Sequence, residues 1–589
     1  MDSDRRSTDV YEQIDGYTKP PIVPLPATDD IDSLKYLGLT INDTSRRIVN
    51  AVKVLTGFRS FETNLPNTIE HHLRKNNMRL PGLFAPAISA TLVLADDARI
   101  ANPLERAATL IFSVRNLCDD IFSGKFSQDQ FRDQGLEMGQ YPNLFSTSVV
   151  VSGKDVQVYK STQKNTIAVI VAGKFYGLNL GNLTSIGQVS KTLSEIVQSA
   201  HANKARADYV SPGPLTAATN ITQQNIFGRL SRNEVNAASL AMLRNSLFTL
   251  CLEIESTPST YSDVAIRAQS NNYQNRWFHS ALQIVVFGNA KAAAICNFTV
   301  YVDGNTMMRS AAEIQKRAAQ VSLHSTIETS EPSPISVKQM DWQVNREAVR
   351  RAYRDIRMIL DNQQATFEIP NIGRKYFDEH QTDAVPAFIL ALQLAMHRMT
   401  GKWVKIEQFL AMSKYRCMDL TTTTVTTPEV VQFGELMENG RMDVQESLSA
   451  LNAAIVSQND QARAARSQLR LGIIFTLYQR SLSASKKAYV RIIVLVAAVL
   501  LRILGLIKMP PGNDVIVSHP EIYPEIPVVG RPGIRLPYVK YLGLHYQIFD
   551  EKTIITLMPG VSWHIPNTEF IYTLRKSLES VQWVLRHKE

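Results

Sequence analysis

Proton-transfer chemistry in proteins relies most often on histidine, and the middle of this chain lacks one over a long stretch. An Asn-Arg-Trp-Phe run at 275–278 leads into an apolar segment at 281–287, a turn at Gly288 and Asn289, and a second apolar segment at 293–302. A histidine pKa of about 6.5 suits proton transfer at neutral pH. No histidine occurs between His279 and His324. The second apolar segment therefore has no general base of this kind.

Other catalytic signatures are also missing from the sequence. The chain has no Walker loop, no GxGxxG, no His-Glu-x-x-His and no GxSxG. His71 and His72 are adjacent, so on a helix they would point in different directions and predict no metal site. The cysteines have no CxxC spacing, which is typical of buried thiols in a reducing compartment. We expect no metal and no other cofactor.

Composition indicates an ordinary globular protein. Of 589 residues, 44% are hydrophobic and 20% are charged. The net charge of +9, from 63 basic and 54 acidic residues, is mild, and no Lys/Arg tract stands out. We therefore expect no nucleic-acid binding. The polar start of the chain carries no apolar signal core and its end lacks Ser-Lys-Leu, so we expect a cytoplasmic protein.

One nearly continuous apolar stretch, from Val490 to Lys508, resembles a membrane segment at first sight. Its uninterrupted part runs only from Ile492 to Leu501, and Arg502 breaks it. A membrane span needs about 20 apolar residues. A helix that is apolar on most sides is more often a core helix, so we expect core packing and no stable membrane insertion.

The pattern of elements mixes strands with many helices, which favours an α/β or α+β protein. We expect a hairpin of 167–171 with 174–178 through Gly173, and two strands at 281–287 and 293–302. The Ser-x-x-Glu pattern at Ser231 predicts a capping box before a helix that reaches about Glu253. Further helices are predicted near 30–55, 103–122, 344–362, 384–400, 428–457, 460–482, 487–508 and 567–586, and strands near 542–549 and 554–558.

Five landmarks occur in order along the chain. They are Met138–Thr147, Gly173–Tyr176, Pro214–Thr216, the Asn-Arg-Trp-Phe run at 275–278 and Ala387–Ala395. Together they resemble the choline/carnitine acyltransferase family. The resemblance implies an α/β fold of two similar domains, each a β-sheet flanked by helices, with a tunnel at the domain interface. It implies a flexible N-terminus at 1–19, a C-terminal-type domain at 20–95 plus 341–589, and an N-terminal-type domain at 96–340.

The resemblance also implies functional positions, and the chain departs from the family at each of them. The family's general base is a histidine that follows the Asn-Arg-Trp-Phe hairpin, where this chain has Asn297–Val300. The family's Ser-Thr-Ser motif donates hydrogen bonds to the oxyanion and the substrates. Here its remnant is Ser518, followed by His519 and Pro520, and no Ser or Thr occurs from His519 to Lys552.

The substrate-binding positions are altered in the same way. The family binds the phosphates of coenzyme A with a Gly-Lys turn and paired lysines. Here Arg374 and Lys375 are followed by Asp378 and Glu379, and acidic groups repel phosphate, so we expect no coenzyme A binding. In the carnitine site Glu407 is kept, while Ile406 replaces a tyrosine and Thr424 or Val425 replaces an arginine.

These departures leave three functions open. The leading hypothesis is a repurposed enzyme that acts without a cofactor on a small hydrophobic substrate in the central tunnel, such as a cyclase of the pericyclic type in a biosynthetic pathway. Such a reaction needs mainly a folded substrate conformer, which confinement supplies. The alternatives are a catalytically inactive pseudoenzyme or binding protein, and a residual coenzyme A-dependent acyltransferase.

The repurposed-enzyme hypothesis names specific residues. Hydrogen-bond donors that could polarise a substrate carbonyl are Thr299, Tyr538 and His279. The expected substrate-lining residues are Phe298, Val300, Ile406, Tyr415, Pro537 and Val539. Ordinary core packing is the alternative for each lining residue, and a histidine held in a hydrogen-bond network is the alternative for His279. We expect a monomer.

Overall fold

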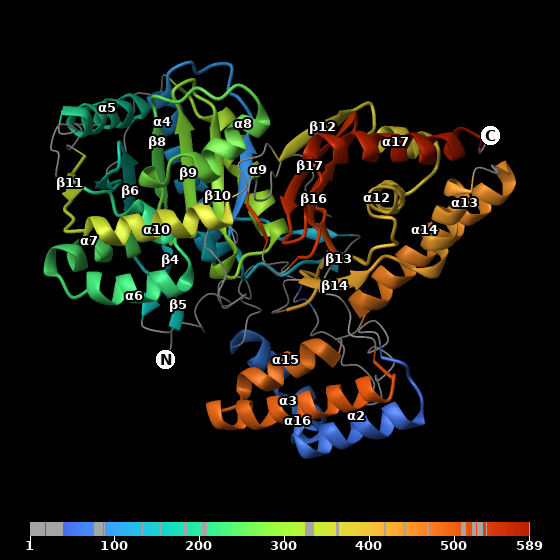
Figure 1. The fold of residues 1–589 in the computed structure, drawn as a ribbon. Helices are drawn as coiled ribbons and strands as arrows, with labels where there is room; N and C mark the ends of the chain where they lie inside the picture. Colours follow the sequence, from blue (N-terminus) through green and yellow to red (C-terminus); the bar gives the residue numbers. More distant parts are fainter. Residues whose placement is uncertain are drawn as a thin grey trace.

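The computed structural model describes most of the chain. The described residues are 18, 20, 39–75, 86, 89–131, 134–152, 155–181, 185–202, 209–323, 335–360, 365–416, 420–439, 443–467, 471–507, 514–520, 526, 534–536 and 539–587. They form two α/β lobes side by side and a smaller helical unit below them (Figure 1). The α/β class with two helix-flanked sheets is confirmed, whereas the tunnel between the domains stays a prediction.

The first lobe is built on a mixed seven-stranded sheet in the order β1-β10-β9-β8-β6-β7-β11. Strand β8 is parallel to β6 and β9, and the other pairs are antiparallel. The strands are β1 (Ser89–Leu94), β6 (Thr166–Val171), β7 (Lys174–Asn179), β8 (Thr249–Glu253), β9 (Leu282–Phe287), β10 (Ala292–Asn297) and β11 (Val337–Met340). The predicted hairpin is β6–β7, and Gly173 takes the left-handed φ of 75° that its turn requires.

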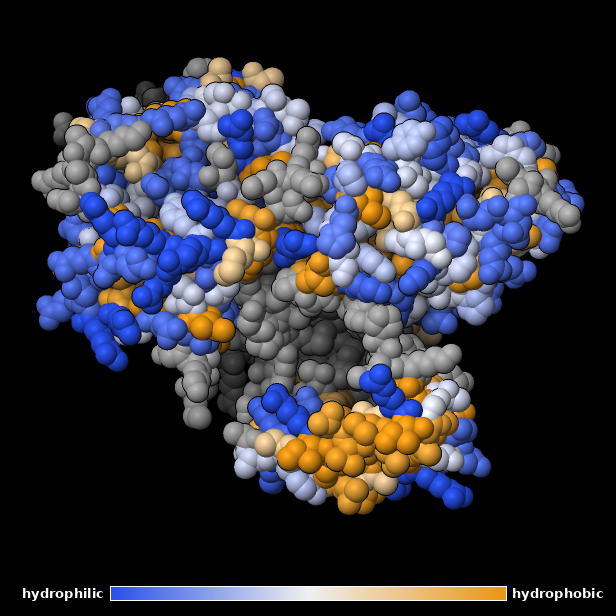
Figure 2. Space-filling view, viewed as in Figure 1, coloured by the Kyte–Doolittle hydropathy of each residue, from blue (hydrophilic) through white to orange (hydrophobic). Residues whose placement is uncertain are grey.

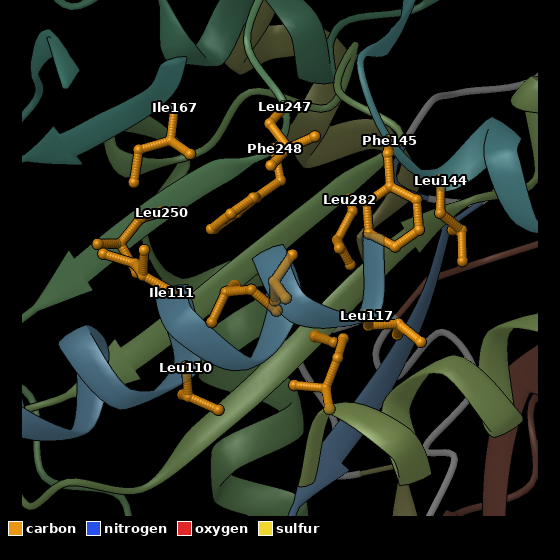
Figure 3. Packing of buried hydrophobic residues seen from close by; sticks show 14 of the residues in the cluster. Leu110, Ile111, Leu117, Leu144, Phe145, Ile167, Leu247, Phe248, Leu250 and Leu282 are labelled. Carbon is orange, nitrogen blue, oxygen red and sulfur yellow. The ribbon is translucent and has the colours of Figure 1, made fainter. Parts of the chain in front are cut away.

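Helices cover both faces of this sheet. One face packs against α4 (Pro103–Ser123), α5 (Ile186–Ala202) and α9 (Gly304–Gln320). Figure 3 shows this core, with Leu110, Ile111 and Leu117 of α4 lying over side chains such as Leu250 and Leu282. The other face packs against α6 (Asn220–Leu230), α7 (Glu234–Arg244), α8 (Tyr261–Ile266) and α10 (Arg346–Ile359). A separate hairpin pairs β4 (Thr147–Ser152) with β5 (Asp155–Lys160), and the short strands β2 (Gln130–Phe131) and β3 (Gln134–Gly135) pair with each other.

The second lobe is built on a six-stranded sheet in the order β12-β17-β16-β15-β13-β14. Its strands are β12 (Thr366–Pro370), β13 (Ile406–Ala411), β14 (Leu420–Thr424), β15 (Val515–Ser518), β16 (Leu542–Ile548) and β17 (Lys552–Pro559). One face packs under α11 (Arg374–Glu379), α12 (Ala384–Thr400), α13 (Pro428–Glu438), α14 (Val444–Ser467) and α17 (Asn567–Arg586). In Figure 1 these helices lie on the side away from the first lobe.

The opposite face of the second sheet is turned toward the first lobe. Side chains alternate along a strand, so Leu544 and Tyr546 of β16 enter the helix-covered core while His545 and Gln547 point the other way. Gln547 Nε2 donates to the carbonyl of Ile526 at 2.7 Å, and the Ile526 side chain belongs to the core of the first lobe. The segment between β15 and β16 therefore crosses from one lobe to the other.

Further contacts join the two lobes at separate points. The amide of Glu137 donates to Ser413 O at 2.7 Å, and Asn305 Nδ2 donates to Ser413 Oγ at 3.3 Å. Arg535 N donates to Ile359 O at 2.7 Å. Strand β1 pairs with β10, and α10 packs on the first sheet. By these contacts the first lobe includes the elements from β1 to α10. The division of the chain into domains at 20–95 plus 341–589 and at 96–340 stays a prediction.

The helical unit combines segments from both ends of the chain. It contains α2 (Asp43–Leu55), α3 (Phe58–Lys75), α15 (Leu471–Ser481) and α16 (Ala484–Ile503). Aromatic rings fill its centre, where Phe58 meets Phe475 and Tyr478 at centroid distances of 5.5 Å. Among the described residues, no helix has the length and apolarity that a membrane span requires.

Some element predictions were wrong. The two helices predicted at 428–457 and 460–482 are three helices, α13, α14 and α15, of which α13 ends at Glu438 and α14 ends at Ser467. The predicted helix from Ser231 to Glu253 is a shorter helix, α7, followed by strand β8. Its cap is Asn233, whose side chain accepts from Asn236 N, while Ser231 ends α6. Helix α16 was expected to be a core helix, but several apolar side chains on one of its sides are exposed.

Candidate functional site between the two sheets

The end of β10 is where the family resemblance expects the catalytic histidine. Asn297 closes the strand, and its side chain donates to Phe278 O and accepts from Thr299 N, both at 2.8 Å. These bonds fix a short helical turn at Phe298–Val300. Val300 is fully buried, while Phe298 and Thr299 are partly exposed. The turn therefore presents a phenyl ring and a hydroxyl, and no group that titrates near neutral pH.

A buried polar network follows this turn. Asp303 caps α9 by accepting from Thr306 N at 2.8 Å, and Asp303 N donates to Gln140 Oε1 at 2.7 Å. Burial raises the pKa of the Asp303 carboxyl, while its hydrogen bonds from Thr306 and Gln140 act against that shift. Gln140 belongs to the first landmark segment of the sequence. The network thus anchors α9 to that segment. This structural role accounts for the burial of the Asp303 carboxylate without any catalytic role.

His279 lies in the core of the first lobe. Its Nε2 is 2.8 Å from Gln223 Oε1, and its ring packs against Phe227 and Trp277. Because an amide oxygen can only accept, Nε2 carries the proton in this bond. Desolvation, with a smaller contribution from the charge of Arg244, lowers the pKa of His279 to about 3. The ring is therefore neutral at physiological pH.

The structure distributes the expected site residues over different clusters. Phe298 and Val300 pack with the core under α4, whereas the neighbours of His279 belong to the core on the other face of the same sheet. Ile406 lies in the helix-covered core of the second lobe, and Tyr415 lies in the core of the helical unit. Val539 packs with Ile516, Leu536 and Met558 on the face of the second sheet that is turned to the first lobe. Pro537 and Tyr538 lie outside the described residues.

A pocket of about 390 Å³ opens at the seam between the lobes. It is lined by one side of α9 and by the crossing segment, at Arg309, Ala312, Glu313, Gln315, Lys316, Ala319 and Ile526. The lining mixes charged and apolar side chains and includes none of the expected substrate residues. A shared apolar tunnel for those residues therefore stays a prediction.

The region that resembles the coenzyme A site carries compensated charges. Lys375 Nζ lies 3.1 Å from Glu551 Oε1, and Lys552 Nζ lies 2.9 Å from Glu368 Oε2. The hydrogen bond from Lys375 to Glu551 raises the pKa of this exposed lysine. Two carboxylates beside the lysines reduce the positive potential that a phosphate group would meet.

The face of the second sheet that is turned to the first lobe carries a serine–histidine pair. Ser518 of β15 and His545 of β16 are register partners on parallel strands. Ser518 Oγ is 2.9 Å from His545 Nδ1, and His545 is 9% exposed. A hydroxyl within hydrogen-bond reach of an imidazole is the arrangement that activates a nucleophile.

Polar side chains continue this pair across the sheet. His545 is opposite Thr556 of β17, which is in turn opposite Thr366 of β12. The two threonine hydroxyls are 3.3 Å apart. Because register partners on one face are neighbours, the row Ser518, His545, Thr556 and Thr366 spans four strands. His545, Thr556 and Thr366 are buried, while Ser518 at the end of the row is partly exposed. Gln547, two residues after His545, contacts the crossing segment.

The neighbouring histidine has a different environment. His519 Nδ1 is 3.2 Å from Tyr546 O, and its ring stacks on the Tyr546 ring at a centroid distance of 5.0 Å. Desolvation lowers the pKa of His519 to about 4, although the bond to Tyr546 acts in the opposite direction. The His519 ring thus packs on the second lobe, and its Nδ1 bonds to a backbone carbonyl, whereas the Nδ1 of His545 bonds to the hydroxyl of Ser518.

The family model of choline/carnitine o-acyltransferases matches residues 77–468. The chain belongs to this family. This family assignment confirms the resemblance of the sequence landmarks.

Three proteins have sequences similar to that of this chain. Carnitine O-acetyltransferase from Rattus norvegicus is 20% identical over 392 residues, which are 64% of this chain and 62% of the relative. Mitochondrial carnitine O-acetyltransferase from Saccharomyces cerevisiae is 22% identical over 200 residues, 32% of this chain and 30% of the relative. Highly reducing polyketide synthase 17 from Metarhizium anisopliae is 25% identical over 262 residues, 41% of this chain and 8% of the relative. The chain therefore spans less than two thirds of each of these proteins.

Two solved condensation domains align with most of this chain at low TM-scores. The first condensation domain of the CDA synthetase is 9% identical to this chain with a TM-score of 0.37. The alignment covers 87% of this chain and 94% of the condensation domain. The condensation domain of the Monacolin K polyketide synthase MokA is 10% identical to this chain with a TM-score of 0.35. The alignment covers 88% of this chain and 96% of the condensation domain.

Sequence reasoning found only half of the pair on the second sheet of this acyltransferase-family chain. Ser518 was noticed as the remnant of a motif, and His545 was not considered. The signal that could have found His545 is its place in β16, where Leu544 and Tyr546 are apolar on both sides of it. The alternation of side chains along a strand then predicts that the imidazole of His545 lies on the sheet face opposite to Leu544 and Tyr546.

Proposed function

We propose that this member of the acyltransferase family is an acyl-processing enzyme of a biosynthetic pathway, and that Ser518 and His545 carry its chemistry in place of the family's histidine. The observation that carries the proposal is the Oγ–Nδ1 distance of 2.9 Å between these residues. The turn at Phe298–Val300, which has no group that titrates near neutral pH, and the ion-paired lysine beside Glu551 support a chemistry that uses neither the family's base nor coenzyme A. Similarity to a polyketide synthase supports a biosynthetic acyl chain as the substrate class.

The proposed reaction follows the nucleophile–base pattern. Ser518 Oγ attacks the carbonyl carbon of a thioester or ester, and His545 Nδ1 takes the hydroxyl proton. The carbon–sulfur or carbon–oxygen bond breaks, and the leaving thiol or alcohol receives that proton from His545. An acyl-serine ester remains on the enzyme. A hydroxyl acceptor or water then removes the acyl group by the same steps in reverse order.

A fluorophosphonate probe tests whether Ser518 is activated, because such probes label serines that a base deprotonates. We expect labelling of the full-length protein at Ser518, no labelling of Ser518→Ala, and at least a hundredfold slower labelling of His545→Gln, since loss of a general base typically costs about 10²–10⁴ in rate. The matched control is His519→Gln, which removes the neighbouring imidazole and should label at the wild-type rate.

The labelling experiment also has outcomes that contradict the proposal. If His545→Gln labels as fast as the wild type, the pair is a satisfied structural hydrogen bond. If no serine is labelled in any form of the folded protein, the binding-protein alternative gains support. Circular dichroism and thermal melting of each variant separate loss of reactivity from loss of the fold.

The second candidate is the cofactor-free cyclisation of a small hydrophobic substrate. The observation that favours it is the partly exposed Phe298 at the end of β10, beside the fully buried Val300. Thr299 and Tyr538 would polarise a substrate carbonyl in this case. His279 suits that role less well, because its Nε2 proton is already donated to Gln223. A Phe298→Ala variant with altered product and unchanged labelling of Ser518 would favour cyclisation.

A further inference from the structure

Helix α16 has two different long faces. Val490 and Leu501 face the helical unit and are 1% and 6% exposed, and Val494 packs against the same core. On the opposite side large apolar side chains are 44% to 77% exposed. They are Tyr489, Ile492, Leu495, Val496, Val499, Leu500, Ile503 and Leu504. We refer to these eight residues as the outer stripe.

The spacing of the outer stripe makes it a continuous surface. Ile492, Val496 and Ile503 recur at intervals of four and seven residues, which places them above one another on a helix. Figure 2 shows the resulting apolar area on the helical unit at the bottom of the molecule. Leu55 of α2, which is 60% exposed, extends it, because Tyr489 Oη donates to Leu55 O at 3.5 Å. A contiguous apolar surface of this kind marks a site of interaction.

The charges of α16 are all of one sign. The helix contains Lys486, Lys487, Arg491 and Arg502 and no acidic residue. Arg491 and Arg502 are eleven residues apart, about three helical turns, so they flank the outer stripe on the same side. Both are exposed. Within the part of the chain that the structure describes, neither forms an ion pair.

We propose that the outer stripe docks the protein on the surface of a membrane that contains anionic phospholipids. A helix with an exposed apolar face, basic residues along its edge and no acidic residue matches the interface of such a membrane, where apolar side chains enter the acyl boundary and arginines reach the headgroups. The helix lies flat in this arrangement, since Arg502 and the packing of Val490 and Leu501 exclude a span. The proposal goes beyond the proposed acyl chemistry and does not depend on it.

Vesicle sedimentation tests the proposal with the full-length protein. We expect binding to phosphatidylcholine vesicles that contain one third phosphatidylserine, and much weaker binding to pure phosphatidylcholine. Replacing both Arg491 and Arg502 by Gln should weaken binding to the anionic vesicles by about tenfold or more, at about fivefold per basic residue. The Val496→Asp, Ile503→Asp double variant should lose binding at least tenfold, because two charges would enter the apolar boundary.

The matched control carries the same chemical change on another surface. Ile221 of α6 is 74% exposed and lies in the first lobe, so Ile221→Asp should bind vesicles as the wild type does. All variants should keep the wild-type melting temperature within a few degrees, since every replaced side chain is already exposed. The fluorophosphonate labelling of Ser518 should also stay unchanged in these variants, which separates this proposal from the proposed function.

Three outcomes would overturn the proposal. The first is equal sedimentation of the wild type with and without anionic vesicles. The second is concentration-dependent dimerisation that the double variant abolishes while vesicles fail to bind, which would assign the stripe to a second copy of the chain. The third is slow thiol labelling of an Ile503→Cys variant in dilute monomeric protein without vesicles, which would show that another segment of the same chain covers the stripe.

Discussion

Burial sets the protonation state of two histidines in this protein. Desolvation lowers the pKa of His279 to about 3 and that of His519 to about 4. In an unfolded chain both would titrate near about 6.5. Between these values the unfolded chain binds protons that the folded protein excludes. The free energy of unfolding must therefore fall as the pH decreases through this window.

Removing the imidazole of His279 should weaken this dependence of stability on pH. The His279→Gln variant should lose less stability between pH 7 and pH 4 than the wild type, by about 3 kcal/mol. Urea titrations at several pH values measure this slope. His587→Gln, at an exposed residue of the C-terminal end of α17, is the control and should follow the wild-type slope. A parallel slope for His279→Gln would contradict the desolvation argument.

A missing histidine is easier to recognise in this sequence than the partner of a histidine that is present. The absence of histidine after the Asn-Arg-Trp-Phe run is visible in the sequence alone. The contact of His545 with Ser518 is not visible, because 26 residues lie between them and only the parallel pairing of β15 and β16 brings them together. The partner of His279, Gln223, is likewise distant in sequence.

Elements with a clear helical period were predicted closely. Helices α12 and α17 begin and end where the apolar pattern placed them, at 384–400 and 567–586. The segment from Ser231 to Glu253 failed for a physical reason. Strand β8 is buried on both faces, so it shows no alternation, and its apolar run continues the pattern of α7. The Ser-x-x-Glu pattern then placed the cap two residues too early.

The cap of α7 is Asn233, so its substitution should destabilise the helix. Asn233→Ala should lower the free energy of unfolding by about 1 kcal/mol, because the orphan amide of Asn236 loses its acceptor. Ser231→Ala should change it by less than about 0.5 kcal/mol. Chemical denaturation measures both. If Ser231→Ala were the more costly change, the capping box predicted from the sequence would be right after all.

The two lobes are held together by residues from the second half of the chain that pack into the first lobe. Ile526 enters the first core from the connection between β15 and β16, and Ile534 contributes to the second core of the same lobe. The two-lobed α/β class followed from ordered landmarks of the sequence. The landmarks do not predict which site residues lie together. They define the order of the elements, but not the side of a sheet to which each side chain points. Ile406 illustrates this, since it lies on the helix-covered face of β13.

The acyl-serine proposed on the face between the sheets can be detected by mass spectrometry. The full-length protein is incubated with the N-acetylcysteamine thioester of octanoic acid, or with octanoyl coenzyme A, then digested and mapped by mass spectrometry. We predict an octanoyl group on the peptide that contains Ser518, formed from the small thioester and only weakly from the coenzyme A thioester, and absent from Ser518→Ala. Acylation of a different residue would contradict the role of Ser518 as the nucleophile. The same holds if octanoyl coenzyme A acylates the wild type and the Ser518→Ala variant equally well.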